Sequence, residues 1–324
     1  DQIDTYFIMD RFGNSQHRSG HNMEPASRPS QKESPMYRLI SLVVIICGFL
    51  PRNLPAQENT AVSLAYRFET GQILDFEVRQ KTDIKTTIQG QGSDATIVNN
   101  SLRRWIVKEV DNKGNATIEL STLRVQMHSK EGLASVEFDS EDSTKQPAKY
   151  QSIMNAVGKP LSRIRISPQG AVLAEQKLLN TKGLAQVDAS KILPPLSDQP
   201  IKLGGSWKHQ YEIPVIRAAT RFPARQTFTL KSIENNTAII AFKTEIIAPV
   251  SNPQLLAELV QHRPSGTIHF DLRQGQIVAQ ISNLDETVVG FAGPASAFQI
   301  KSTSIERLIG DSIKNASVTR QSRD

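Results

Sequence analysis

The sequence predicts a mainly β fold of the α+β class. We expect either one curved antiparallel sheet or two duplicated half-barrel-like units, each with a short amphipathic helix. Three observations lead to this prediction. After residue 57 apolar residues recur at every second position over most of the chain, turn signals separate these runs, and only two stretches have a clear helical period. Alternation of this kind is typical of antiparallel strands with one buried face.

Strands are predicted where apolar and polar residues alternate. Leu74, Phe76 and Val78 alternate with charged neighbours. After Leu120 the apolar positions shift by one residue, which predicts a bulge or bend in that strand. The other alternating runs have apolar residues at Ala116, Ile118 and Leu120, then at Leu123, Val125 and Met127, at Ala238, Ile240 and Phe242, and at Ile268, Phe270 and Leu272.

Turns are predicted from clusters of Gly, Asn, Asp and Pro between the strands. They lie at Asp111–Asn115 (DNKGN), Ser167–Gly170 (SPQG), Glu234–Asn236 (ENN) and Arg273–Gly275 (RQG). These residue types adopt the backbone conformations that tight turns require. We therefore expect long hairpins that follow one another along the chain.

Two short helices are predicted from apolar residues spaced three and four positions apart. The first lies between Pro147 and Gly158, which are typical of a helix start and end. The second begins with Asn252 as cap and Pro253 in the first turn, and ends before Pro264. A third and weaker candidate covers 177–193. The expected buried positions are Tyr150, Ile153, Met154 and Val157 in the first helix, and Leu255, Leu256, Leu259 and Val260 in the second.

The elements recur in the same order in two halves, as a hairpin, a helix and a second hairpin. Gly170 in the first half corresponds to Gly275 in the second, and Ile164 to Ile268. The first half has an additional polar stretch at 129–146. We predict an ancient duplication. The expected parts are a first β-rich repeat at 57–192, a Pro-rich bridge at 193–200, a second repeat at 201–310 and a disordered tail at 311–324.

An export signal is predicted at 36–56. Met36 and Arg38 precede the apolar run Leu39–Leu50, and Ala56 ends a short polar stretch, which together have the three parts of a secretory signal peptide. The run is shorter than the roughly 20 residues that a spanning helix needs, so no stable transmembrane anchor is expected. Residues 1–35 are polar and lack an apolar period, and we expect them to be disordered and to precede the true start.

The composition excludes several classes of function. Cys47 is the only cysteine in the sequence, and it follows two isoleucines, so lipidation, disulfides and cysteine-based zinc sites are not expected in the exported chain. Removal of the first 56 residues changes the formal charge from +6 to +5. Basic residues are scattered, and Arg163 and Arg165 alternate with isoleucines as on the solvated face of a strand. With few aromatic residues for base stacking, no nucleic-acid partner is expected.

No catalytic, cofactor or metal residues are predicted. His128, His209, His262 and His269 lack metal-ligand spacing, and we expect them at the surface or at strand edges. Ser206, in the segment GGSW, lacks the GxSxG pattern and leads into a strand, so we expect a glycine turn that seats Trp207 in the core.

An acidic group offers the best candidate for a cation site. Glu137, Asp139, Glu141 and Asp142 place carboxylates close together, as hard cations prefer. The group lacks the glycine and the terminal glutamate of a calcium loop, so a solvated hairpin edge is the simpler interpretation.

Four short motifs resemble those of a family of exported bacterial proteins of unknown function. In chain order they are FDS (138–140), ISPQG (166–170), PIKLGGSW (200–207) and FDLRQG (270–275). The resemblance covers about 62–309. It implies curved antiparallel sheets packed on helices, similar to the half-barrel of lipoprotein carriers, and it supplies no site residues.

A half-barrel leaves two possibilities for its inner face. Leu74, Phe76, Phe242, Phe270 and Phe298 either line a slot for a lipid-like or other apolar molecule, or pack as ordinary core beneath the helices. We expect a non-enzymatic exported protein of the cell envelope, without cofactor, that binds an apolar ligand or an envelope protein. A structural or interaction protein with a filled core, and an unrecognised hydrolase, stay open as alternatives.

Overall fold

The computed structural model describes residues 61–179, 192–215 and 220–313. The predictions for residues 1–35, for the signal peptide at 36–56 and for Cys47 lie outside these ranges. All of the described residues belong to one compact unit.

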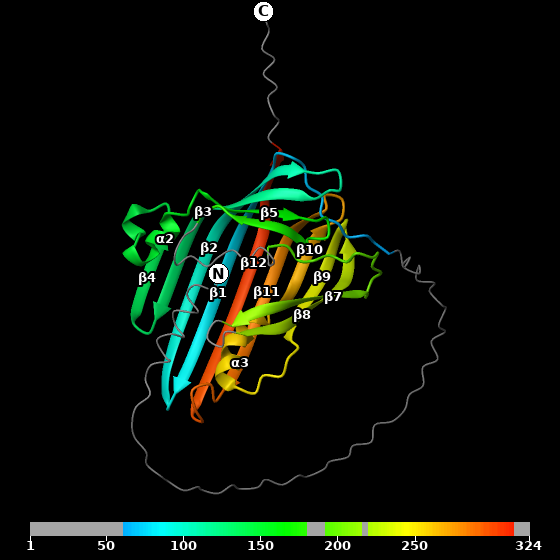
Figure 1. The fold of residues 1–324 in the computed structure, drawn as a ribbon. Helices are drawn as coiled ribbons and strands as arrows, with labels where there is room; N and C mark the ends of the chain where they lie inside the picture. The colour runs from blue at the N-terminus through cyan, green and yellow to red at the C-terminus, as the bar shows by residue number, and fades with distance from the viewer. Residues whose placement is uncertain (1–60, 180–191, 216–219, 314–324) are drawn as a thin grey trace, which may run out of the picture. The chain divides into compact units, whose positions relative to one another are not determined.

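The described residues form one twelve-stranded antiparallel sheet, which is curved and not closed (Figure 1). Its order is β6-β5-β3-β2-β1-β12-β11-β10-β9-β8-β7, and β4 pairs with β3 beside this path. The mainly β prediction is confirmed, and of the two expected architectures the single curved sheet is observed. The strands are β1 (Gln72–Ile88), β2 (Gln91–Val110), β3 (Ala116–Glu131), β4 (Ala134–Asp139), β5 (Pro160–Ile166), β6 (Val172–Lys177), β7 (Ser206–Val215), β8 (Thr220–Glu234), β9 (Thr237–Ile246), β10 (Ser265–Asp271), β11 (Gln276–Val289) and β12 (Ser296–Ile313).

Both predicted helices are present as short elements. Asn252 caps the second helix, because its side chain accepts hydrogen bonds from the backbone N–H groups of Gln254 and Leu255. Leu259 and Val260 are buried as predicted, whereas the leucines at 255 and 256 are only partly buried. The helical elements are η1 (Ser143–Lys145), η2 (Ala148–Tyr150), α2 (Gln151–Met154), α3 (Pro253–Leu259) and η4 (Val260–His262).

The predicted bulge and turns are also confirmed. The pairing of β3 with β5 shifts register between Leu120 and Ser121, and buried positions then continue at Val125 and Met127. Gly170 and Gly275 adopt positive φ angles of 82° and 66° in their turns. Such angles are natural for glycine and strained for other residues.

Three boundaries differ from the sequence prediction. Lys177 ends β6 and is not helical, and most of the weak helix candidate at 177–193 lies outside the described residues. The polar stretch at 129–146 contains β4 and η1. β12 continues to Ile313, into the segment expected to be a tail, because Gln72–Leu74 of β1 pair with it.

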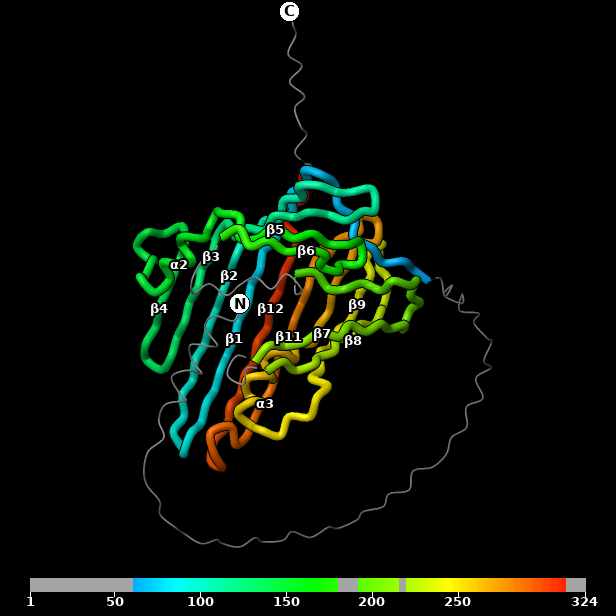
Figure 2. The backbone as a smooth tube through the Cα atoms, in the orientation of Figure 1, coloured from blue at the N-terminus to red at the C-terminus, as the bar shows by residue number. Residues whose placement is uncertain are grey.

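One hydrophobic cluster, here called the main core, joins both halves of the chain. It includes Leu74 and Trp105 from β1 and β2, and Phe228 and Phe270 from β8 and β10. The β5–β6 and β7–β8 hairpins cross over the long central strands on the same side (Figure 2). The face that carries the main core is therefore the inner, concave face of the sheet.

The segment before β1 holds the main core together. The backbone N–H of Tyr66 donates to the Pro168 carbonyl at 2.7 Å, and that of Arg67 donates to the Gly275 carbonyl at 2.9 Å. The Tyr66 side chain is 2% exposed, and its hydroxyl donates to the Pro194 carbonyl at 2.9 Å. The segment thus contacts a turn from each half and also the Pro-rich bridge.

Tyr66 predicts how stability changes at alkaline pH. Burial raises the pKa of its phenol well above the ordinary value. In the unfolded chain the same group ionises near pH 10, so its contribution is fully present below about pH 10 and is lost as pH rises further. Above about pH 10 the free energy of unfolding of the parent should therefore fall with pH, and Tyr66 should account for up to about 1.4 kcal/mol of this fall per pH unit. Tyr66→Phe should lack this part of the fall.

Urea denaturation at about pH 8 and about pH 11 would measure this slope. At the lower pH the variant should lose about 1 kcal/mol, because the Pro194 carbonyl loses its hydrogen bond. An unchanged alkaline slope in Tyr66→Phe would contradict the prediction.

Candidate functional site

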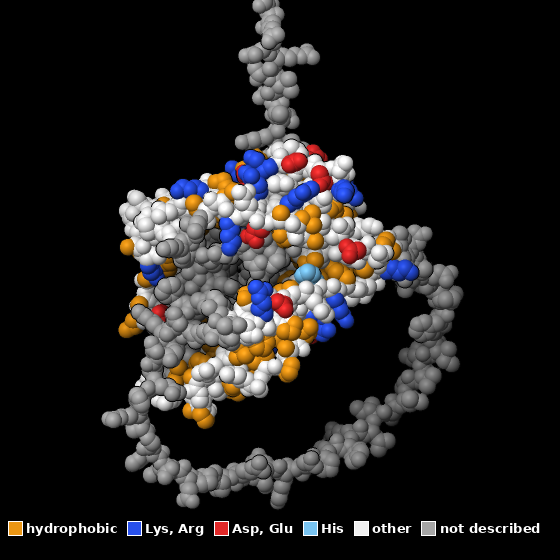
Figure 3. All heavy atoms as spheres, in the orientation of Figure 1, with side chains coloured by type: hydrophobic (Ala, Val, Ile, Leu, Met, Phe, Trp, Pro, Cys, Tyr) orange, Lys and Arg blue, Asp and Glu red, His pale blue; other side chains and the backbone are white. Residues whose placement is uncertain are grey.

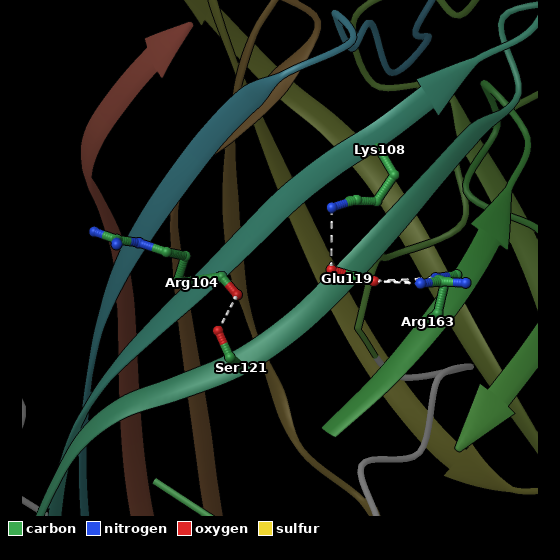
Figure 4. Close-up of polar contacts among 5 residues, drawn as sticks. All are labelled: Arg104, Lys108, Glu119, Ser121 and Arg163. Carbon is green, nitrogen blue, oxygen red and sulfur yellow. Dashed lines mark hydrogen bonds and ion pairs between the residues drawn. The ribbon is translucent and has the colours of Figure 1, made fainter. Parts of the chain in front are cut away.

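Charged side chains lie on the outer face of β2, β3 and β5 (Figure 4), and those of Lys108 and Arg163 are exposed to solvent. Glu119 accepts a hydrogen bond from Arg163 Nε at 3.2 Å and lies 3.5 Å from Lys108 Nζ. The hydrogen bonds from Arg163 hold the pKa of Glu119 below its ordinary value, although burial opposes them. The Ser121 hydroxyl donates to the backbone carbonyl of Arg104 at 3.4 Å. This network stabilises the sheet and confirms the solvated face predicted from the arginines of β5.

The inner face is filled at the end that holds the main core. Leu74, Phe76, Phe242 and Phe270, four of the five residues predicted to line a slot or form a core, belong to this cluster. Their exposed fractions lie between 1% and 6%. Because these four residues pack within one cluster that joins both halves of the chain, they are ordinary core.

The fifth predicted residue, Phe298, belongs to a second apolar area on the same face. This area, here called the inner patch, lies on β1, β2, β11 and β12, and in the full-length chain its side chains are 2–8% exposed. It lies outside the main core and outside both clusters that the helices form. The apolar residues of the inner patch are Ile84, Ala95, Ile97, Leu284, Val288, Phe298 and Ile300. Glu286 of β11, opposite Ile300, also faces inward among them and pairs with Arg263 at 3.2 Å.

Strand register places these residues on one face. Ile84 lies opposite Ala95 of β2 and opposite Ile300 of β12, and Phe298 lies opposite Val288 of β11. Directly opposed residues of paired strands share a face, and every second residue of a strand does too. Because Ile84 is an even number of positions from Leu74 in β1, the inner patch and the main core share the inner face.

The two helices cover the inner face on either side of the patch. α2 packs at β3 and β4, where Ile153 joins Val125 and Phe138. α3 packs at β7 and β8, where Leu259 joins Ile213. In Figure 3 hydrophobic side chains gather in the lower part of the molecule, where Figure 1 labels α3. The inner patch thus lies on the long strands, with α2 beyond its β2 side and α3 and η4 in contact with its β11 side.

A polar band separates the inner patch from the main core. The hydroxyls of Thr82 and Ser302 lie 2.9 Å apart within it, at the border of the patch. Strand register places seven further polar residues on the inner face between the inner patch and the main core. They are Gln80, Asn99, Ser101, Gln280, Ser282, Ser304 and Glu306.

A charged pair faces inward in this band. Arg103 Nη1 lies 3.8 Å from Glu306 Oε2, and the two side chains are 30% and 26% exposed. Burial raises the pKa of Glu306, and the positive charge of Arg103 opposes this effect. An apolar area beside a polar band with an arginine is complementary to an amphiphile, since arginine recognises carboxylate and phosphate groups.

The structure places the other sequence-derived candidates in structural roles. Ser206 begins β7, and its hydroxyl lies 2.8 Å from that of Thr229. As predicted, the glycine turn seats Trp207, which stacks on Phe228 at 5.3 Å and is partly buried. His262 was expected at the surface, and this was wrong. It is buried in η4, because this turn follows α3 onto the inner side of β11.

The acidic group lies beside a shallow pocket of about 190 Å³ on the outer side of β2, β3 and β4. Glu137 pairs with Lys145 at 3.1 Å, and Asp139 accepts from the Gln126 side chain at 2.9 Å. Asp142 caps η1 through Thr144. Within 61–179, 192–215 and 220–313 no three His, Cys, Asp or Glu side chains cluster as a metal site would require.

Comparisons with known proteins give limited likeness. No family model and no curated protein matches the chain. A structure of lipovitellin, described for its lipid–protein interactions, is similar at 10% identity and a TM-score of 0.46, over 78% of this chain. The chain spans only 26% of that lipovitellin chain. An outer membrane channel from Pseudomonas putida F1 has 8% identity and a TM-score of 0.28, covering 75% of this chain and 97% of the channel.

No helix among the described residues has the length and apolar character to cross a membrane.

Sequence reasoning identified Phe298 but missed most of the inner patch. The signal was present in β1, where Thr82, Ile84 and Thr86 alternate with charged or polar residues. The pairing of β1 with β12 could not be read from the sequence, because their contact spans more than 200 residues.

Proposed function

We propose that the chain is a non-enzymatic exported protein of the cell envelope that binds a lipid-like amphiphile on the inner face of its curved sheet. The inner patch carries this proposal. The patch is an apolar area of the inner face that does not belong to the packed main core. It lies on the long central strands of the sheet. Apolar surfaces with a few placed polar groups are typical of sites for small ligands.

The polar band supports an anionic amphiphile as the class of ligand. An apolar tail would lie on the inner patch, and a carboxylate or phosphate group would lie near Arg103. Burial raises the pKa of Glu306 in the band, so the charged form of this carboxyl group is disfavoured there. An anionic amphiphile with one or two acyl chains fits this arrangement better than a purely apolar molecule.

Binding can be tested with a chain that begins at Gln57, which keeps all of the described residues. Native mass spectrometry and lipid extraction would reveal a co-purified ligand. Fluorescence titration with cis-parinaric acid, which has an apolar tail and a carboxylate, would then measure affinity. We expect saturable binding to the chain after lipid removal.

Variants on one strand sharpen the test. Ile84→Ser should weaken binding of the probe about tenfold or more, because it removes buried apolar area from the patch. Lys85→Ser, one position along β1 and exposed on the outer face, should bind as the parent does. The double variant Thr82→Val/Ser302→Ala removes a paired set of hydroxyls and should tighten binding. Equal affinities in all three would refute the proposed site.

One observation favours a second candidate, an interaction protein with a filled core. Four of the predicted lining residues are packed in the main core. A ligand-free protein that fails to bind cis-parinaric acid, and whose inner patch stays protected in the chain from Gln57, would support this candidate instead.

A further inference from the structure

Two hairpin tips lie side by side at one end of the long strands. The β1–β2 turn is at Gln89–Gly90, and the β11–β12 turn spans 290–295. Ile88 pairs with Ser296, and the Gln89 backbone N–H donates to the Ala295 carbonyl at 3.1 Å. In Figure 1 the two tips are neighbours at the lower end of the sheet.

These tips contain no charged residue. The stretches 86–93 (TTIQGQGS) and 287–300 (TVVGFAGPASAFQI) have no Asp, Glu, Lys or Arg, although 22% of the whole chain is charged. Val289 is 73% exposed, and Pro294 is exposed on the same tip. Phe291 is partly buried and lies edge-on to Phe298 at 6.0 Å. The end of the sheet is thus uncharged and partly apolar.

Charges begin behind the tips on two neighbouring levels of the sheet, which lie two residues apart along the strands. Lys85 lies opposite Asp94 of β2, and Lys301 lies opposite Asp83 of β1 and Asp285 of β11. Lys301 Nζ is 3.6 Å from Asp285 Oδ2, and Lys81 Nζ is 3.0 Å from Asp83 Oδ2. Lys81, Lys85 and Lys301 thus balance Asp83, Asp94 and Asp285. Strands rise about 3.3 Å per residue, which puts Lys85 about 13 Å and Asp83 about 20 Å behind the β1–β2 turn.

This pattern matches a lipid bilayer. One leaflet's share of the hydrocarbon core is about 15 Å thick, and interfacial segments insert about 5–10 Å. Tips that enter to this depth would leave the balanced charges in the headgroup region. Single apolar side chains on a surface are normal and need no such partner. Here, however, two adjacent tips both lack charge, and the charges that follow them lie at the depth expected of the headgroup region.

We propose that the two hairpin tips dock the protein on a bilayer surface. Val288 and Phe298 of the inner patch lie on the first residues behind the tips, so docking would place the patch next to the lipid. Docking does not require that the patch holds a ligand, and it therefore goes beyond the proposed function. Because the charges behind the tips are balanced, docking should not depend on anionic lipid.

Co-sedimentation with phosphatidylcholine vesicles tests this proposal on the chain from Gln57, since the described residues form a compact unit. The parent chain should bind, and addition of phosphatidylglycerol should change binding little. Val289→Asp should reduce the partition coefficient about tenfold, because a charge then enters the apolar interface. Val289→Trp should show a blue-shifted tryptophan emission when vesicles are added.

Leu133→Asp is the matched control. Leu133 is fully exposed at the β3–β4 tip, but Lys130 and Glu131 flank it, so this tip should stay in water. The control should bind vesicles as the parent does, and circular dichroism would confirm that each variant is folded.

Three results would overturn docking: a parent chain that stays in the supernatant, binding only to anionic vesicles, or equal losses in Val289→Asp and Leu133→Asp. A chain that binds cis-parinaric acid in solution but does not sediment refutes docking alone. A chain that sediments but does not bind the probe refutes the proposed function alone.

Discussion

Replacing Gly266 with alanine is expected to lower the free energy of unfolding by at least about 4 kcal/mol. Gly266 lies in β10 between Phe242 of β9 and Ser282 of β11. A Cβ atom at this position would overlap the backbone carbonyl oxygen of Ile281 and lie 3.0 Å from the Phe242 ring. The strand partner is backbone and cannot turn away, so β10 and β11 would have to separate.

Gly92→Ala is the control for this prediction. Gly92 lies in β2, is exposed, and has no atom within 4 Å of an added Cβ. Alanine there should leave stability unchanged or raise it by up to about 1 kcal/mol, because it reduces the freedom of the unfolded chain. Urea denaturation of both variants measures the difference. If Gly266→Ala falls within about 1 kcal/mol of the parent, the register of β10 and β11 is wrong.

The local structure was predictable from the sequence because local signals determine it. Asn252 and Pro253 specify the start of α3, and positive-φ glycines specify the turns. The parity shift after Leu120 predicted the bulge that β5 pairing shows. Each signal acts within a few residues and needs no distant contact.

The long-range arrangement was not predictable in the same way. Leu193 and Leu196 of the Pro-rich bridge are buried in the main core, and no local signal in the sequence indicated this burial. His262 was misplaced because its burial depends on where α3 lies against β11. The inner patch likewise exists only because β1 pairs with β12. The predicted duplication stays a prediction, although both halves contribute strands to one sheet.

Tyr66→Ala is the second large expected effect and tests whether the halves fold together. The side chain lies between Phe68 and Phe270, with ring centroids at 6.0 Å and 5.6 Å. Removing a buried aromatic ring from a core costs about 3–5 kcal/mol. Because Tyr66 bonds to the Pro168 turn of the first half and packs on Phe270 of the second half, we expect the loss to appear equally in each half.

The two tryptophans of the chain report on the halves separately. Trp105 packs on Phe76 in β1 at 4.5 Å, and Trp207 packs on Phe228 in β8 at 5.3 Å. Trp105→Phe leaves Trp207 as the only fluorescent probe, and Trp207→Phe leaves Trp105. The urea midpoints of unfolding measured in these two variants should be equal. Adding Tyr66→Ala should lower both midpoints by the same amount. Cooperative unfolding of one domain requires such agreement between probes. A midpoint that moves for Trp105 alone would show that the segment before β1 stabilises only the first half, and that the sheet contains two units that unfold independently.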